Sequence, residues 1–133
     1  MDVCTYLYLG RRCEEAVGLY QSVLGAQVTC LVRFSEAPPP LRTPGDDDLV
    51  FHSTLALGET RLNLSDDQTG EQGLPNGFAF LVHVDEFGAV ERIVGGFAAA
   101  GGQVIVEPGP TPWTHQYGIV RDPFGVIWKV QFS

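Results

Sequence analysis

The sequence predicts an α+β fold made of two βαβββ modules, with about eight strands and two main helices in all. Two observations carry this prediction. Apolar residues alternate over several short runs and recur at helical spacing over two longer ones, and the order strand, helix, three strands occurs twice. The segment Gly25-Ala26-Gln27-Val28 also returns as Gly101-Gly102-Gln103-Val104, each time just after a predicted helix.

The length of 133 residues suits one domain. We therefore expect a single domain over residues 1–133, built from module 1–66 and module 77–133. The polar, Gly-rich stretch 67–76 is the predicted linker.

The first module begins with a strand and a helix. Apolar residues from Cys13 to Leu24 recur every three or four positions, and Gly25 suits the left-handed conformation that ends a helix. The Pro- and Asp-rich stretch Ser35–Asp48 predicts an exposed, mobile loop. The predicted strands are Cys4–Leu9, Gln27–Phe34, Val50–Leu57 and Thr60–Ser65.

The second module repeats this order. Asp85 can cap a helix whose apolar stripe contains Val90, Ile93 and Phe97. Strand alternation places Trp128 on the side that faces this helix. The predicted strands are Phe78–Val84, Gln103–Val106, Gln116–Arg121 and Val126–Phe132.

Composition excludes several classes of partner. A formal charge of −8 repels phosphate backbones and anionic membrane surfaces, so we expect neither nucleic acid nor membrane as a partner. No run approaches the ~20 apolar residues that span a bilayer. We expect no signal peptide, because Met1-Asp2-Val3 lacks a basic start and a following apolar run. Three cysteines at no metal-ligand spacing favour the reducing cytoplasm.

An ordered set of short motifs spans nearly the whole chain. They are Tyr6-Leu7-Tyr8-Leu9, Cys13-Glu14-Glu15-Ala16, Leu19-Tyr20, Leu24-Gly25-Ala26, His52, Gly58-Glu59-Thr60, Ser65-Asp66, Trp113 and Asp122-Pro123-Phe124-Gly125-Val126-Ile127-Trp128. With these residues the chain resembles the vicinal oxygen chelate superfamily of glyoxalase I, bleomycin-resistance proteins and extradiol dioxygenases. It is most similar to the PhnB-like branch. The resemblance implies that the eight strands form a cleft of the glyoxalase and bleomycin-resistance type.

The resemblance also indicates where a metal would be bound. Metal-dependent members use four cleft-facing side chains, and those places fall on Thr5, Asn63, Ala79 and Lys129. None of these is a strong ligand for a divalent ion, and a lysine ammonium has no lone pair to donate. We therefore expect no metal and no other cofactor.

The polar-leaning strand faces supply the candidate ligand contacts. His52 is the best candidate for catalysis, as a general base or as a hydrogen-bonding partner of a ligand, or else it is a polar lining residue. Lys129 either holds an anionic group or covers apolar surface with its stem. The predicted ligand-binding residues are Thr5, Leu7, His52, Thr54, Asn63, Leu81, His83, Trp113, Tyr117 and Lys129.

Two functions from different classes fit these residues. The preferred one is a metal-independent protein that binds a small organic molecule, as bleomycin-resistance relatives hold a basic drug. The alternative is an enzyme of lyase, isomerase or dioxygenase type that uses either a divalent metal, with His52 and His83 as ligands, or His52 as a general base. The resemblance implies a homodimer, with or without exchange of modules between subunits through residues 67–76.

Overall fold

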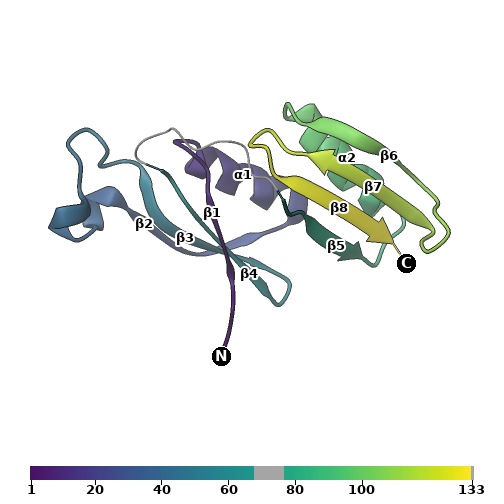
Figure 1. The fold of residues 1–133 in the computed structure, drawn as a ribbon, viewed down its shortest axis with the longest axis horizontal. Coiled ribbons are helices and arrows are strands. Elements are labelled where there is room, and N and C mark those ends of the chain that lie inside the picture. Colours follow the sequence, from purple (N-terminus) through teal and green to yellow (C-terminus); the bar gives the residue numbers. More distant parts are fainter. Residues whose placement is uncertain (68–76, 133) are drawn as a thin grey trace. The chain divides into compact units, whose positions relative to one another are not determined.

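The computed structural model describes residues 1–67 and 77–132 and confirms the predicted class, with eight strands, two main helices and two four-stranded sheets (Figure 1). The chain divides into two compact units, Met1–Gly73 and Leu74–Ser133. The predicted linker 67–76 lies outside the described residues except for Asp67. No helix in the described part of the chain is both long and apolar enough to span a bilayer.

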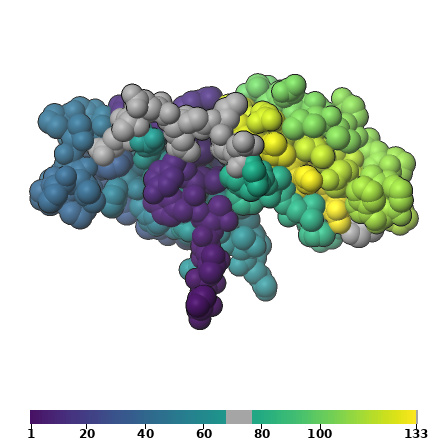
Figure 2. Space-filling model, viewed as in Figure 1, coloured from purple at the N-terminus to yellow at the C-terminus, as the bar shows by residue number. Residues whose placement is uncertain are grey.

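The first unit follows the order strand, helix, three strands. Its elements are β1 (Thr5–Tyr8), α1 (Cys13–Leu24), β2 (Gln27–Arg33), β3 (Val50–Leu57) and β4 (Thr60–Ser65). The strand order in the sheet is β1-β4-β3-β2, with β1 and β4 parallel and the other pairs antiparallel. The N-terminal residues project from this unit in Figure 2. Among them, Asp2 forms an ion pair with Arg61 of β4.

The second unit has the same topology. Its elements are β5 (Phe80–Val84), α2 (Ala89–Ala99), β6 (Gln103–Gly109), β7 (Gln116–Arg121) and β8 (Ile127–Phe132). The strand order is β5-β8-β7-β6, and again the first strand lies parallel to the last. Each unit is therefore one βαβββ module.

One face of each sheet packs on the helix of its own unit. In the first unit Leu55, Leu62 and Leu64 are at most 2% exposed and lie on the side of α1, whose Tyr20 is fully buried. In the second unit Trp128 stacks on Phe97 of α2 with ring centroids 5.7 Å apart. This confirms the predicted orientation of Trp128 and leaves the opposite face of each sheet without a helix from its own unit.

Two local predictions were wrong. Asp85 does not cap α2, because the chain first makes a turn in which the Ala89 amide bonds to the Glu86 carbonyl, and the helix begins only after Gly88. The stretch 35–48 is not uniformly exposed. It contains the end of a 3₁₀ turn, Phe34–Glu36, and a second such turn, Pro39–Leu41, and it buries Ala37 and Asp46.

Candidate functional site

The side of the first sheet that faces away from α1, here called the first open face, carries a row of polar side chains. Register pairs place Tyr6 beside Asn63, Asn63 beside Thr54, and Thr54 beside Cys30, so the row crosses all four strands. His52 lies on the same face, two residues before Thr54 on β3. The predicted residues His52, Thr54 and Asn63 are thus brought together.

These side chains form one continuous chain of hydrogen bonds. The Tyr6 hydroxyl lies 3.0 Å from His52 Nδ1, and His52 Nε2 lies 3.2 Å from Thr54 Oγ1. Thr54 Oγ1 donates to Asn63 Oδ1 at 2.8 Å, and Asn63 Nδ2 donates to the Thr5 carbonyl at 3.2 Å. Every side chain in the row except the terminal Cys30 is therefore tied to its neighbours.

The fixed end of this chain determines the tautomer of His52. The Thr5 carbonyl only accepts, so it holds Asn63 with its amide nitrogen toward β1 and its oxygen toward Thr54. The Thr54 proton then points to Asn63, and Thr54 Oγ1 accepts from His52. The neutral imidazole of His52 accordingly carries its proton on Nε2, and Nδ1 accepts from Tyr6.

Tyr6 is the residue of this site that the sequence prediction missed. Its ring centroid lies 5.6 Å from that of His52 and 5.3 Å from that of Tyr8, so three rings cluster on the first open face. Burial raises the pKa of the Tyr6 phenol, and a hydrogen bond with Ser65 partly offsets that rise. The phenol is therefore neutral at pH 7 and donates its proton toward His52.

Thr5 and Leu7 do not belong to the first open face. They pair in register with Leu62 and Leu64, and Leu7 is only 5% exposed, so both residues lie on the side of α1. Thr5 contributes its backbone carbonyl instead of its side chain. The phase predicted for β1 was wrong by one residue, because the aromatic Tyr6 and Tyr8 alternate with the apolar Leu7 and Leu9 and the pattern does not distinguish the two faces.

The second open face, the side of the β5-β8-β7-β6 sheet away from α2, holds the remaining candidates. Lys129 on β8 is flanked by Leu81 and by Ile119 in register. In the next row Gln131 lies between His83 and Tyr117 and is 3.3 Å from His83 Nδ1.

Two further aromatic side chains of the second unit come from the loop before β7. The Trp113 ring meets Tyr117 edge to face at 5.6 Å, and it is 64% exposed. His115 is exposed, with its ring 6.3 Å from Phe132. Leu81, His83, Trp113, Tyr117 and Lys129 are thus grouped in one unit.

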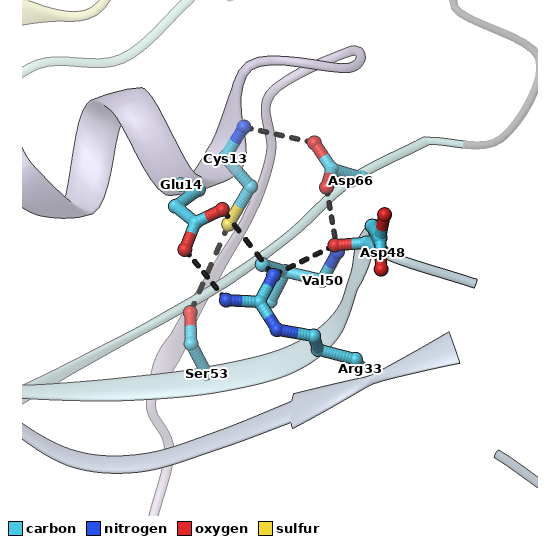
Figure 3. Close-up of polar contacts among 7 residues, drawn as sticks. All are labelled: Cys13, Glu14, Arg33, Asp48, Val50, Ser53 and Asp66. Atoms are coloured by element: carbon cyan, nitrogen blue, oxygen red, sulfur yellow. Dashed lines mark hydrogen bonds and ion pairs between the residues drawn. The ribbon is translucent and has the colours of Figure 1, made fainter. Parts of the chain in front are cut away.

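A third polar cluster is structural (Figure 3). Asp66, 5% exposed, accepts from the Cys13 amide at 2.8 Å and from the Val50 amide at 2.7 Å, so it closes the start of α1 against β3 and β4. Arg33 of β2 donates to both carboxylate oxygens of Glu14 on α1. Burial raises the pKa of the Cys13 thiol to about 12, which makes it inert at neutral pH.

The four positions at which the resemblance places metal ligands do not carry a donor set for a divalent ion. The Lys129 ammonium has no lone pair, Ala79 has no donor atom, and both ends of the Asn63 amide are already bonded. Within residues 1–67 and 77–132, no three His, Cys, Asp or Glu side chains lie close enough to hold a metal. The side chains present therefore do not fit the ion that metalloenzymes of this fold use.

The fold, two βαβββ modules in one chain, places the protein in a known superfamily. Residues 5–130 match the Glyoxalase/Bleomycin resistance protein/Dioxygenase superfamily, and the chain belongs to that superfamily. It is 24% identical over 139 residues to Protein YjdN of Escherichia coli (strain K12). The alignment covers 98% of this chain and 94% of that protein.

Solved structures share the fold. Protein PA1353 from Pseudomonas aeruginosa superposes with a TM-score of 0.87 at 28% identity, over 100% of this chain and 98% of that one. A PhnB protein from Bacillus cereus superposes with a TM-score of 0.80 at 19% identity, over the whole of both chains. The predicted superfamily and its PhnB-like neighbours are confirmed.

Proposed function

We propose that this chain binds a small organic molecule on its first open face, with His52 at the centre of the site. The observation that carries the proposal is the hydrogen-bonded chain from Tyr6 to Asn63, which holds four polar side chains in one arrangement on a sheet face that carries no helix of its own unit. Such preorganised polar groups beside apolar rings are typical of ligand sites.

The arrangement also defines the chemistry of the ligand. Because the Tyr6 proton is directed at His52 and one lone pair accepts from Ser65, the phenolic oxygen keeps a second lone pair that can accept from a ligand hydroxyl or amide. Tyr6 and Tyr8 are 41% and 54% exposed, and their rings offer an apolar surface for a flat molecule. We expect a flat ligand with a hydrogen-bond donor.

The test compares 2-naphthol with 2-methoxynaphthalene, which lacks the donor. Binding is measured by chemical-shift titration for the wild type, Tyr6→Phe, His52→Ala and a control, His115→Ala. We expect 2-naphthol to bind more tightly, and His52→Ala to weaken it about tenfold at an unchanged melting temperature. Loss of thermal stability without a change in affinity would show that His52 is structural, and equal binding of the two probes would exclude Tyr6 as an acceptor.

Acid–base catalysis is the second candidate function, and the His52 tautomer favours it. A proton from a bound substrate can pass to the Tyr6 oxygen while the Tyr6 proton moves to the unprotonated Nδ1 of His52. In this scheme Tyr6→Phe abolishes turnover while the affinity for substrate falls only modestly. Nitrogen-15 spectra of the histidine rings test the premise, since the scheme requires His52 protonated on Nε2 in the resting state.

Of the predicted contacts, His52, Thr54 and Asn63 are assigned to this ligand, together with Tyr6. We further propose a cytoplasmic homodimer. Three free cysteines agree with a reducing compartment, and each sheet ends in strands whose outer edges need cover. Light scattering of the purified protein tests the dimer, and a monomeric mass at all concentrations would refute it.

A further inference from the structure

Lys129 is the only lysine in the chain, and it lies in the middle of the second open face. Its strand, β8, runs between β5 and β7, as Figure 1 shows. Its register neighbours on either side, Leu81 and Ile119, are both apolar, and its own side chain is half-buried. The only lysine side chain therefore lies between two apolar residues on this face.

Among the lysine and arginine side chains in the described part of the chain, Lys129 alone has no hydrogen-bond or ion-pair acceptor. Five arginines pair with carboxylates, and two donate to backbone carbonyls. The pairs are Arg11 with Asp46, Arg12 with Glu15, Arg33 with Glu14, Arg61 with Asp2, Arg92 with Glu86, Arg42 with the Ala37 carbonyl and Arg121 with the Gly125 carbonyl.

The carboxylates of the chain lie elsewhere. The sequence has 16 acidic side chains against 8 basic ones, yet the strands that the structure describes contain a single carboxylate, Glu107. Glu107 lies on the edge strand β6, which β7 separates from β8. No carboxylate therefore occupies a strand position next to Lys129, although the protein is strongly acidic overall.

This arrangement favours an anionic partner over a cationic one. A half-buried lysine without a counter-ion leaves its ammonium with no charged partner in the protein, and an arriving carboxylate supplies one through a charge-assisted hydrogen bond. A cationic ligand would meet Lys129 and Arg121 on β8 and β7 with no strand carboxylate to neutralise it. The negative net charge of the chain would favour a cationic ligand, whereas the positive charge of this face favours an anionic one. The charge of the face determines the preference, because salt screens the more distant groups.

We propose that the second open face binds an organic monocarboxylate with a flat apolar body. Lys129 pairs with the carboxylate, a single cation matching a single negative charge. Leu81 and Ile119 contact the adjoining carbon atoms, and the edge-to-face pair of Trp113 and Tyr117 supplies an aromatic surface within the same unit. The proposed site uses residues of the second unit alone, so neither proposal depends on the other.

The experiment uses three probes of one shape and different charge: 2-naphthoate, 2-naphthamide and 2-naphthylmethylammonium. Affinities are measured at physiological salt for the wild type, Lys129→Met, Lys129→Arg and a control, Arg92→Met, which removes one positive charge from α2. Because Lys129 is the only lysine, carbon-13 labelling of lysine at Cε produces a single resonance that reports directly on the bound probe.

We expect the wild type and Arg92→Met to bind 2-naphthoate about tenfold or more tightly than the amide, and the ammonium most weakly. Lys129→Met should equalise the acid and the amide at an unchanged melting temperature, and Lys129→Arg should keep most of the preference. A preference that persists in folded Lys129→Met, an equal affinity of the wild type for all three probes, or no binding of any of them would overturn the proposal. The naphthol titration on His52 is unaffected by these outcomes.

Discussion

The turn between β7 and β8 depends on Asp122, and replacing this residue by Asn should destabilise the second unit. Asp122 is 2% exposed. Its Oδ1 accepts from the amides of Phe124 and Val126 at 2.9 and 3.0 Å, and its Oδ2 accepts from the Trp128 indole nitrogen at 2.9 Å. In Asp122→Asn the better orientation keeps the oxygen on the two amides, so the new NH₂ group faces the indole N–H and two donors oppose each other.

The magnitude follows from these contacts. One charge-assisted hydrogen bond is lost, worth about 1.5–3 kcal/mol, and the two remaining bonds weaken because their acceptor is now neutral. We expect Asp122→Asn to lower the free energy of unfolding by about 2–4 kcal/mol. The part caused by the opposed donors should vanish in Trp128→Phe, which has no indole N–H.

A double-mutant cycle isolates that part. Urea unfolding is followed by far-UV circular dichroism for the wild type, both single variants and Asp122→Asn/Trp128→Phe. The double variant should be more stable than the sum of the single effects predicts, by about 1–2 kcal/mol. Additivity within about 0.5 kcal/mol would refute the opposed-donor reasoning.

Three further predictions follow from burial, charge and donor chemistry. A thiol reagent at pH 8 should modify the exposed Cys4 and Cys30 in the native protein, and Cys13 only after unfolding, because burial raises the pKa of Cys13 to about 12; rapid reaction of all three would contradict its burial. Arg33 lowers the pKa of Glu14, so Glu14→Gln should cost less than about 1 kcal/mol at pH 7 in this exposed pair. That difference should fade as the pH falls below about 4.5, through the depressed native pKa, and a difference that grew with acidity would refute the assignment. Titration with zinc, nickel, manganese or iron should show no stoichiometric tight binding. Elemental analysis that finds one bound ion per chain would refute the conclusion that the side chains present cannot hold a divalent metal.

Much of the fold was predictable because its signals are local. Alternation in the β3–β4 hairpin separates Leu55 and Leu62 from Thr54 and Asn63, and the register confirms that separation. In β8 the large apolar Trp128 next to Lys129 made the phase unambiguous. Where every residue was apolar or amphipathic, as in β1, the same rule had nothing to distinguish the two faces.

The hydrogen-bonded chain of the site was not predictable from pattern. It depends on β1 lying parallel to β4, with Tyr6 opposite Asn63 although many residues separate them in sequence. Periodicity reports which face a residue takes within its own strand, and it carries no information about which distant strand lies alongside. The candidate residues His52, Thr54 and Asn63 were therefore found singly, while their common arrangement and the role of Tyr6 required the structure.

The remote cap on α1 bears on the order in which this protein folds as it is made. The carboxylate that binds the first amide of α1 comes from Asp66, 53 residues further along the chain, and the same carboxylate holds the first residue of β3. A helix of 12 residues is marginal in water without tertiary support. During synthesis on the ribosome, α1 should therefore become stable only after β4 and Asp66 have emerged. The first module should then become resistant to protease in a single late step, when Asp66 binds the start of α1.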